Sequence, residues 1–198
     1  ATSVTPKTDS KPTYTHYGKA TSNTPVDMRS MVGHLTRKIK IVSGTNSNNY
    51  GFRVLVTTIA DKKGSVTFHG VQFVEGGQPD SEKAALHFQD TIDNSVLSLV
   101  EKCSFVKCSG NCLRLVNNAN VTINMNVFAE GRKFMVYVDR QKAYRFTNNL
   151  MIGARVSRSL ESLTTTVIPE EVACYYQPTS ADLTTEEVNL VSGNGCFG

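Results

Sequence analysis

The sequence predicts an all-β protein that folds as a parallel β-helix with coils of about 23 residues. The first observation is a fixed interval, because Phe105, Phe128 and Met151 follow one another about 23 positions apart. The second is that apolar residues alternate with polar ones, which is the period of a strand with one buried face. The third is that the connections are too short for crossover helices. Repeats of this size bury their apolar faces by stacking on one another.

The repeated region contains two strand-like runs that keep the same step. The copies of the first run lie at 66–73, 97–105, 121–128 and 144–151. The second run places Leu113 and Leu115 one interval before Val136 and Val138. The first copy lies about nine residues too far from the second copy, and we place this polar insertion at 75–83.

Polar residues keep the interval too. Asn126 and Asn149 are one step apart, and Cys103 lies one step earlier. We predict that the two asparagines form an inward ladder at a turn, where their amides satisfy backbone groups that the corner leaves unpaired. The alternative is a pair of solvated turn residues. At the same inward position, Cys103 is expected to be a buried free thiol.

The repeat divides the chain into three regions. Residues 1–13 are rich in Thr, Ser, Lys and Pro and are expected to form an extended arm. The β-helix is predicted to span 14–155, with strands at 38–44 and 52–57 in its first coils. The period is lost after this region, so 156–198 is expected to be an irregular C-terminal cap or a linker.

Composition excludes several classes of function. The chain has 198 residues and a net charge of +4, with Lys and Arg scattered and no accompanying aromatic stacking motif, so no nucleic-acid partner is expected. No apolar stretch approaches the roughly 18–20 residues of a membrane span. No signal peptide is evident at the start, so a secreted protein would have its signal upstream or removed. No cofactor is expected.

Four of the five cysteines are candidates for disulfides. Cys108 and Cys112 flank a short turn, and Cys174 and Cys196 lie near the C-terminus. A zinc site is the alternative, but the spacing lacks close pairs and a neighbouring histidine, so we predict no metal. Asn120, followed by Val and Thr, is a glycosylation sequon. Sequon and paired cysteines together indicate an extracellular or cell-surface location.

One stretch near the N-terminus resembles a known family. The matching residues are Val26, Asp27, Met28, Arg29, Val32, Gly33, Leu35, Thr36, Arg37, Ile39 and Ile41, preceded by His16, Tyr17 and Gly18. This pattern resembles the fibrocystin and fibrocystin-L family, which also includes the cell-migration-inducing hyaluronidase. The resemblance implies a right-handed parallel β-helix that follows a G8 domain in a large extracellular glycoprotein. His16, Asp27, Met28, Arg29, Gly33 and Arg37 are its motif residues.

The chain departs from this family at positions that bear on catalysis. Met31 stands where members usually carry an acidic residue, and at 86–90 one histidine of a His-Phe-His pair is kept as His87. If the chain is an enzyme, the resemblance implies catalysis by Asp27, Arg29, His87 and Asp90. Glycoside hydrolysis needs two carboxyl groups about 5–10 Å apart, and nothing in the sequence brings the two aspartates together.

The sequence favours structural interpretations of these residues. Asp27 and Arg29 can form an ion pair or a turn that fastens the first coil. For His87, the alternative is a wall residue on the outer face of a coil, since Leu86 and Phe88 alternate with it as the inward set.

Three functions remain. The first is a non-catalytic structural or adhesion module, a rigid scaffold whose partners are other extracellular chains or further domains of the same protein. The second is a glycan-cleaving enzyme, either a hydrolase or a lyase that uses a basic residue such as Arg29 or Arg53 with a carboxylate. The third is a glycan-binding domain that uses Tyr14, Tyr17 and Tyr50, although the absence of tryptophan counts against it. The sequence favours the first.

Overall fold

The computed structural model describes residues 31–44, 50–60, 62–79, 81–91, 95–155, 172–178 and 190–197. All regular elements in these ranges are strands, β1 to β17, and they lie in one compact unit, Gly33–Gly198. The expected arm at 1–13 lies outside the described residues. So do the motif residues His16, Asp27, Met28 and Arg29, and the tyrosines Tyr14 and Tyr17.

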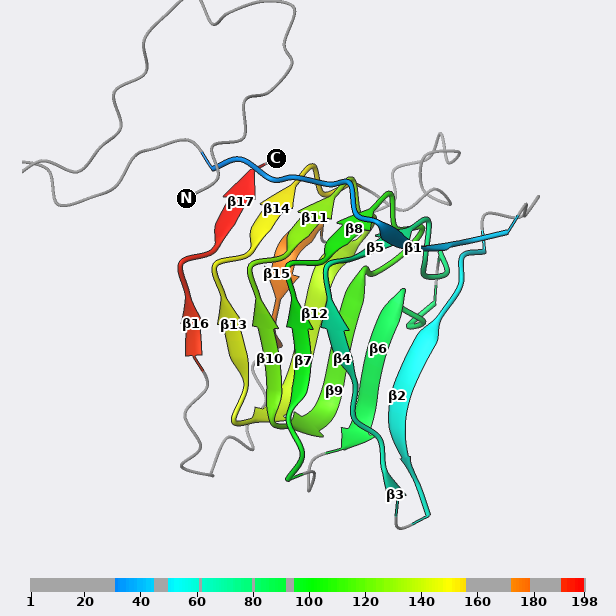
Figure 1. Ribbon diagram of the computed structural model, residues 1–198, viewed down its shortest axis with the longest axis vertical. Helices are drawn as coiled ribbons and strands as arrows, with labels where there is room; N and C mark the ends of the chain where they lie inside the picture. Colours follow the sequence, from blue (N-terminus) through cyan, green and yellow to red (C-terminus); the bar gives the residue numbers. More distant parts are fainter. Residues whose placement is uncertain are drawn as a thin grey trace, which may run out of the picture. The chain divides into compact units, whose positions relative to one another are not determined.

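The strands form three sheets (Figure 1). Sheet 1 contains, in spatial order, β1 (Ile39–Val42), β5 (Val71–Val74), β8 (Ser104–Val106), β11 (Val127–Ala129), β14 (Leu150–Ile152) and β17 (Gly195–Phe197). Sheet 2 contains β16 (Leu190–Ser192), β13 (Arg145–Thr147), β10 (Val121–Asn124), β7 (Ser98–Glu101) and β4 (Thr67–His69). Sheet 3 contains β15 (Ala173–Tyr176), β12 (Phe134–Lys142), β9 (Leu113–Ala119), β6 (Leu86–Thr91), β2 (Val54–Ile59) and β3 (Lys62–Lys63).

The chain visits the three sheets in turn and therefore winds in coils. It passes from sheet 2 to sheet 1 to sheet 3 and then returns to sheet 2 one strand further along. Each strand pairs in parallel with the strand one coil away, and only β2 and β3 pair antiparallel among the described strands. Phe128 lies opposite Phe105 on one side and Met151 on the other, which confirms the predicted coil length. The all-β class and the parallel solenoid are as predicted.

The polar insertion is divided between two corners. The connection from β5 to β6 at 75–85 has eleven residues, whereas the equivalent connection at 107–112 has six. Five of the extra residues therefore lie here, close to the predicted place. The other four lie between β6 and β7, because Phe88 and Leu99 are farther apart than their partners Leu115 and Thr122. The prediction of a single insertion at 75–83 was wrong in that respect.

The C-terminal region 156–198, expected to be an irregular cap or linker, contains three strands in its described parts. β15 pairs with β12, β16 with β13, and β17 with β14, so each sheet gains one more strand. The connections before β15 and β16 are long, which hides the period from the sequence although the register continues.

The inward residues stack in ladders through successive coils. The rings of Phe73, Phe105 and Phe128 lie nearly parallel, with centroids 4.6 Å and 4.8 Å apart. All three rings are buried. Offset stacking at this spacing adds to the free energy gained by burying the rings.

The predicted asparagine ladder is confirmed and extends by one member, Asn194. The Asn126 Nδ2 donates to Asn149 Oδ1 (3.0 Å), and the Asn149 Nδ2 donates to Asn194 Oδ1 (3.0 Å). Cys103 occupies the preceding place as a buried free thiol, as predicted. Its backbone N–H donates to Asn126 Oδ1 at 2.9 Å.

Candidate functional site

His87 lies on the outer face of sheet 3, as the wall interpretation predicts. Its neighbours Leu86 and Phe88 belong to the core, and parallel register places His87 beside Leu55 on β2 and Arg114 on β9. Further along the same row, Arg114 lies opposite Tyr137 of β12. Although the row faces outward, His87 is only 4% exposed, so this part of the wall is covered.

Two arginines flank the His87 ring. The Arg53 Nη2 lies 2.9 Å from His87 Nδ1, and because a guanidinium nitrogen only donates, Nδ1 accepts and the ring is neutral. Burial lowers the pKa of His87 to about 4, assisted by the charges of Arg53 and Arg114 and opposed by Asp90. In the described part of the chain, the buried His87 Nε2 has no hydrogen-bond partner.

Arg114 is the second buried group, at 8% exposed. Its guanidinium carbon lies 4.1 Å from the centre of the Tyr137 ring, a cation–π contact. Its Nη2 lies 2.9 Å from Glu82 Oε2, on the long connection between β5 and β6. Tyr176 extends the aromatic surface, 5.6 Å from Tyr137.

We call Arg53, His87, Arg114, Tyr137 and Tyr176 the sheet 3 patch. Only His87 was singled out from the sequence as a site residue, and Arg53 entered merely as a conceivable base for a lyase. The one signal for the others is the register, because Arg114 lies 27 positions after His87 and Tyr137 lies 23 positions after Arg114. The 23-residue period aligns Arg114 with Tyr137, whereas the four extra residues between β6 and β7 hide the alignment of His87 with Arg114.

The described catalytic candidates do not form a pair of carboxyl groups. The Asp90 carboxylate accepts hydrogen bonds from Asn117 Nδ2 (3.0 Å) and Gln89 Nε2 (3.2 Å). His87 faces two arginines, and among the described residues no hydrogen bond joins it to a carboxylate. Asp27 and Arg29 lie outside the described ranges, so their relation to His87 stays a prediction.

We predict that stability falls in acid because of His87. An unfolded histidine has a pKa near 6.5 and the folded one about 4, so the unfolded state binds more protons as the pH falls between these values. The loss is expected to be on the order of 2 kcal/mol after solvent screening. It is measured as the urea unfolding free energy at pH 7.0 and pH 4.0.

One variant isolates this effect. His87→Gln is expected to flatten the pH dependence of the unfolding free energy between pH 6.5 and 4. Equal slopes for the parent and His87→Gln would show that other groups cause the loss.

Gly33 and Arg37, two positions of the sequence resemblance, lie in a segment that crosses sheet 1. This segment, 33–37, is called the strap, and Figure 1 shows it in blue ahead of β1. The Ser104 hydroxyl donates to the carbonyl of Leu35, and Arg37 Nε donates to the carbonyl of Lys102 at 2.6 Å. The strap therefore ties the β8 coil to the start of β1, a structural role for Gly33 and Arg37.

Gly33→Ala is expected to lower the unfolding free energy by about 1–3 kcal/mol through overpacking. An added Cβ would lie 2.7 Å from Val127 Cγ1 and 2.9 Å from Leu150 Cδ2. Gly44→Ala is the matched control, since its Cβ meets nothing within 4 Å. Urea denaturation of both variants tests the expectation. Equal stabilities would show that the close packing at Gly33 does not contribute to the stability of the strap.

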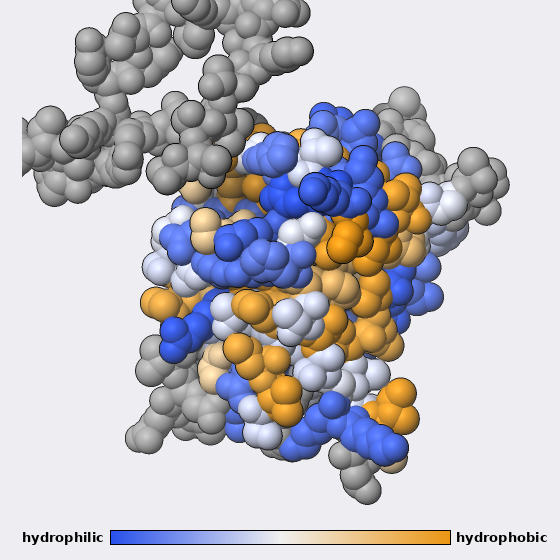
Figure 2. Space-filling view, viewed as in Figure 1, coloured by the Kyte–Doolittle hydropathy of each residue, from blue (hydrophilic) through white to orange (hydrophobic). Residues whose placement is uncertain are grey.

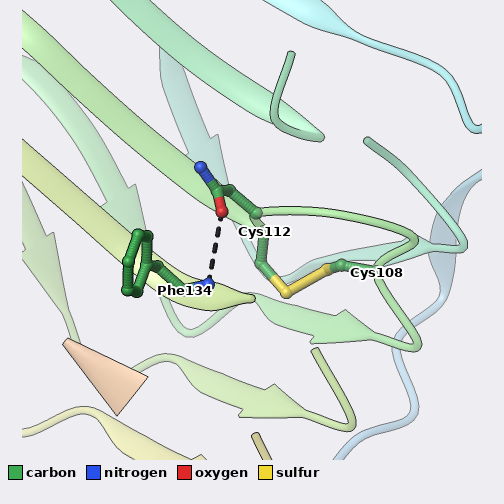
Figure 3. The surroundings of a disulfide bond; sticks show 4 residues. Cys108, Cys112 and Phe134 are labelled. Carbon is green, nitrogen blue, oxygen red and sulfur yellow. Dashed lines mark hydrogen bonds between the residues drawn. A yellow bond between two sulfur atoms is a disulfide. The ribbon is translucent and has the colours of Figure 1, made fainter. Parts of the chain in front are cut away.

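The two predicted disulfides are present. Cys108 pairs with Cys112 and Cys174 pairs with Cys196. Figure 3 shows the first of them at the corner between β8 and β9, where Asn111 Oδ1 accepts a hydrogen bond from Phe134 N at 3.3 Å. Two disulfides in one small unit indicate an oxidising environment.

Other predicted features are reported for the described residues only. There, no group of three or more His, Cys, Asp or Glu side chains is placed to hold a metal ion. The same ranges contain no helix with the length and apolar character of a membrane span. Asn120 lies at a corner with φ of 52°, and its glycosylation stays a prediction. On the face of Figure 2, apolar and polar residues are interspersed.

Comparison of the chain with protein-family models, with curated proteins and with solved structures gave no significant match.

Proposed function

We propose that this chain is a non-catalytic structural and adhesion module that presents the outer faces of its coils to other protein chains or to further domains of its own protein. The carrying observation is the environment of His87, which is buried, neutral and flanked by Arg53 and Arg114. Acid–base hydrolysis of a glycosidic bond requires two carboxyl groups. A neutral histidine between two guanidinium groups supplies neither of these carboxyl groups.

The core supports a rigid scaffold. Each asparagine of the ladder joins two coils through its side chain, and the phenylalanine stack runs through three coils without interruption. Such ladders resist bending because each coil is fastened to both neighbours. The two disulfides support an extracellular or cell-surface location for this module.

We further propose that the coils wind in the right-handed sense and that the chain is a segment of a larger fibrocystin-like glycoprotein. Right-handed crossovers between parallel strands are strongly preferred. The use of Gly33 and Arg37 in the strap gives two of the resemblance positions a structural purpose. An experimental structure of the chain with its natural neighbouring domains tests both points, and a left-handed winding would contradict the first.

Glycan binding is the second candidate function. Tyr137 and Tyr176 lie close together on sheet 3, beside the guanidinium of Arg114. Aromatic rings next to a cation on an outer wall can stack against sugar rings. Binding of neutral and acidic oligosaccharides, measured by calorimetry with Tyr137→Ala as a comparison, tests this alternative.

The decisive experiment concerns catalysis. The chain, produced by secretion, is incubated with hyaluronan and with other polysaccharides. The length of each polysaccharide is then followed by light scattering. We expect no shortening. Shortening that disappears in a folded His87→Gln or Asp27→Asn variant would replace the scaffold with a glycan-cleaving enzyme. These two variants separate a genuine site from a contaminating activity.

A further inference from the structure

We propose that Arg114 is a docking point for an acidic side chain of a partner protein, and that Glu82 occupies this point when no partner is bound. The inference rests on the proposed interaction function. It adds the place of contact and the chemistry of the partner. It also gives the long connection between β5 and β6 a role as an internal competitor.

The first step is that Arg114 is a fixed donor. Its side chain is nine-tenths buried, with the Tyr137 ring 4.1 Å from the guanidinium carbon. A guanidinium already held in place loses little conformational freedom when it binds a carboxylate. Arg114 is therefore preorganised, unlike an arginine on an exposed flexible stem.

The second step is that the present occupant binds weakly. The Glu82 side chain is 79% exposed and reaches Arg114 only through Nη2, at 2.9 Å. Within the described ranges, the Arg114 Nε is buried and has no hydrogen-bond partner while Glu82 is in place. An incoming carboxylate that contacted both Nε and Nη2 would make the bidentate geometry that guanidinium groups favour. Exposed ion pairs of the Glu82 kind favour the bound form by only about 1.5- to 5-fold.

The third step concerns the charged and aromatic residues that surround Arg114. Arg53 adds a second positive charge beside the neutral His87, while the Asp90 carboxylate is bonded to Asn117 and Gln89. Tyrosine and arginine are the residues that most often dominate binding at protein interfaces. The carboxylates of Asp90 and Asp139 lie near the patch as well. The patch thus combines two guanidinium groups with an aromatic rim.

The fourth step identifies the partner as a peptide. The group now on Arg114 is a glutamate side chain on a loop, and this loop is closed by its own hydrogen bond from Gln78 N to the carbonyl of Lys83 at 2.8 Å. The site is therefore already shaped for a carboxylate presented by a turn of polypeptide. An acidic loop or tail of a partner would present the same group.

The test measures binding of a labelled, end-blocked hexaglutamate peptide to the full chain by fluorescence anisotropy at low ionic strength. Glu82→Gln is expected to tighten binding about 2- to 6-fold, because the competitor is removed. Arg114→Gln in the Glu82→Gln background is expected to weaken it at least 10-fold. Arg145→Gln is the matched control, since Arg145 is exposed on sheet 2, and it should leave binding unchanged.

Each contrary outcome overturns the proposal. No change in binding on Glu82→Gln, a substitution at a largely exposed side chain, would show that Glu82 is not an occupant. An equal loss in Arg145→Gln would show general charge attraction. Tighter binding of polygalacturonate with the same dependence on Arg114 would make the partner an acidic glycan.

Arg114→Lys guards against a folding defect, since it keeps the charge and loses the bidentate fork. We expect at least a 3-fold weakening, with an unchanged circular dichroism spectrum. A negative result in these binding experiments would not contradict the proposed non-catalytic scaffold. That proposal is tested separately, by the length of the polysaccharide after incubation with the chain.

Discussion

Replacing Asn149 with leucine is expected to lower the free energy of unfolding by about 3–5 kcal/mol. Asn149 is fully buried. Its Oδ1 accepts from the backbone N–H and the Nδ2 of Asn126, at 2.9 Å and 3.0 Å. Its Nδ2 donates to the carbonyl of Ile123 and to Asn194 Oδ1, each at 3.0 Å. Leucine removes all four of these bonds. The Asn126 N–H loses its Oδ1 acceptor, whereas Asn126 Nδ2 keeps the Val100 carbonyl and Asn194 Oδ1 keeps the backbone N–H at position 149. Each buried group left unpaired costs about 1–3 kcal/mol.

Urea denaturation followed by circular dichroism measures the loss. Asn148→Gly is the control, because Asn148 is exposed and has φ of 56°, which glycine adopts without strain. The control should stay within about 0.5 kcal/mol of the parent. A similar stability for both variants would mean that the ladder adds little beyond the sheet hydrogen bonds.

The features that repeat could be predicted from the sequence, since a solenoid converts spacing along the chain into contact in space. Phe105 and Phe128 stack because their interval equals the coil length, and Asn126 lies against Asn149 for the same reason. The last coil was missed because insertions in 156–198 break the interval. Asn194, preceded by Gly193 in the left-handed region as Met125 precedes Asn126, was the remaining signal.

The sheet 3 patch and the strap could not be predicted in this way. The surroundings of His87 depend on the side chains of Arg53 and Arg114, which come from two other coils. Periodicity tells which residues are neighbours across strands but not which long side chains fold over them. The strap lies across sheet 1 without pairing as a strand, so its path depends on single contacts such as Gly33 against Val127.

Phe105→Ala is expected to cost about 3–5 kcal/mol, the usual range for removing a buried ring. Phe105 has one ring on each side, that of Phe73 at 4.6 Å and that of Phe128 at 4.8 Å. The substitution leaves a cavity that the parallel strands on either side hold open. Phe197→Ala is the matched control, since Phe197 is 51% exposed on the last strand, and it should cost less than about 1 kcal/mol.

The distribution of the loss tests rigidity more sharply than its size does. In a solenoid each coil contacts only its neighbours, so stability is passed from coil to coil. If the ladders join the coils into one cooperative unit, Phe105→Ala lowers amide protection in β5, β8 and β11 together, and all probes report one unfolding transition. If protection falls in β8 alone while β14 and β17 keep the parent values, the coils open one at a time. A wall that opens coil by coil would not hold Arg114 and its neighbours in a fixed geometry, and the scaffold proposal would lose its physical basis.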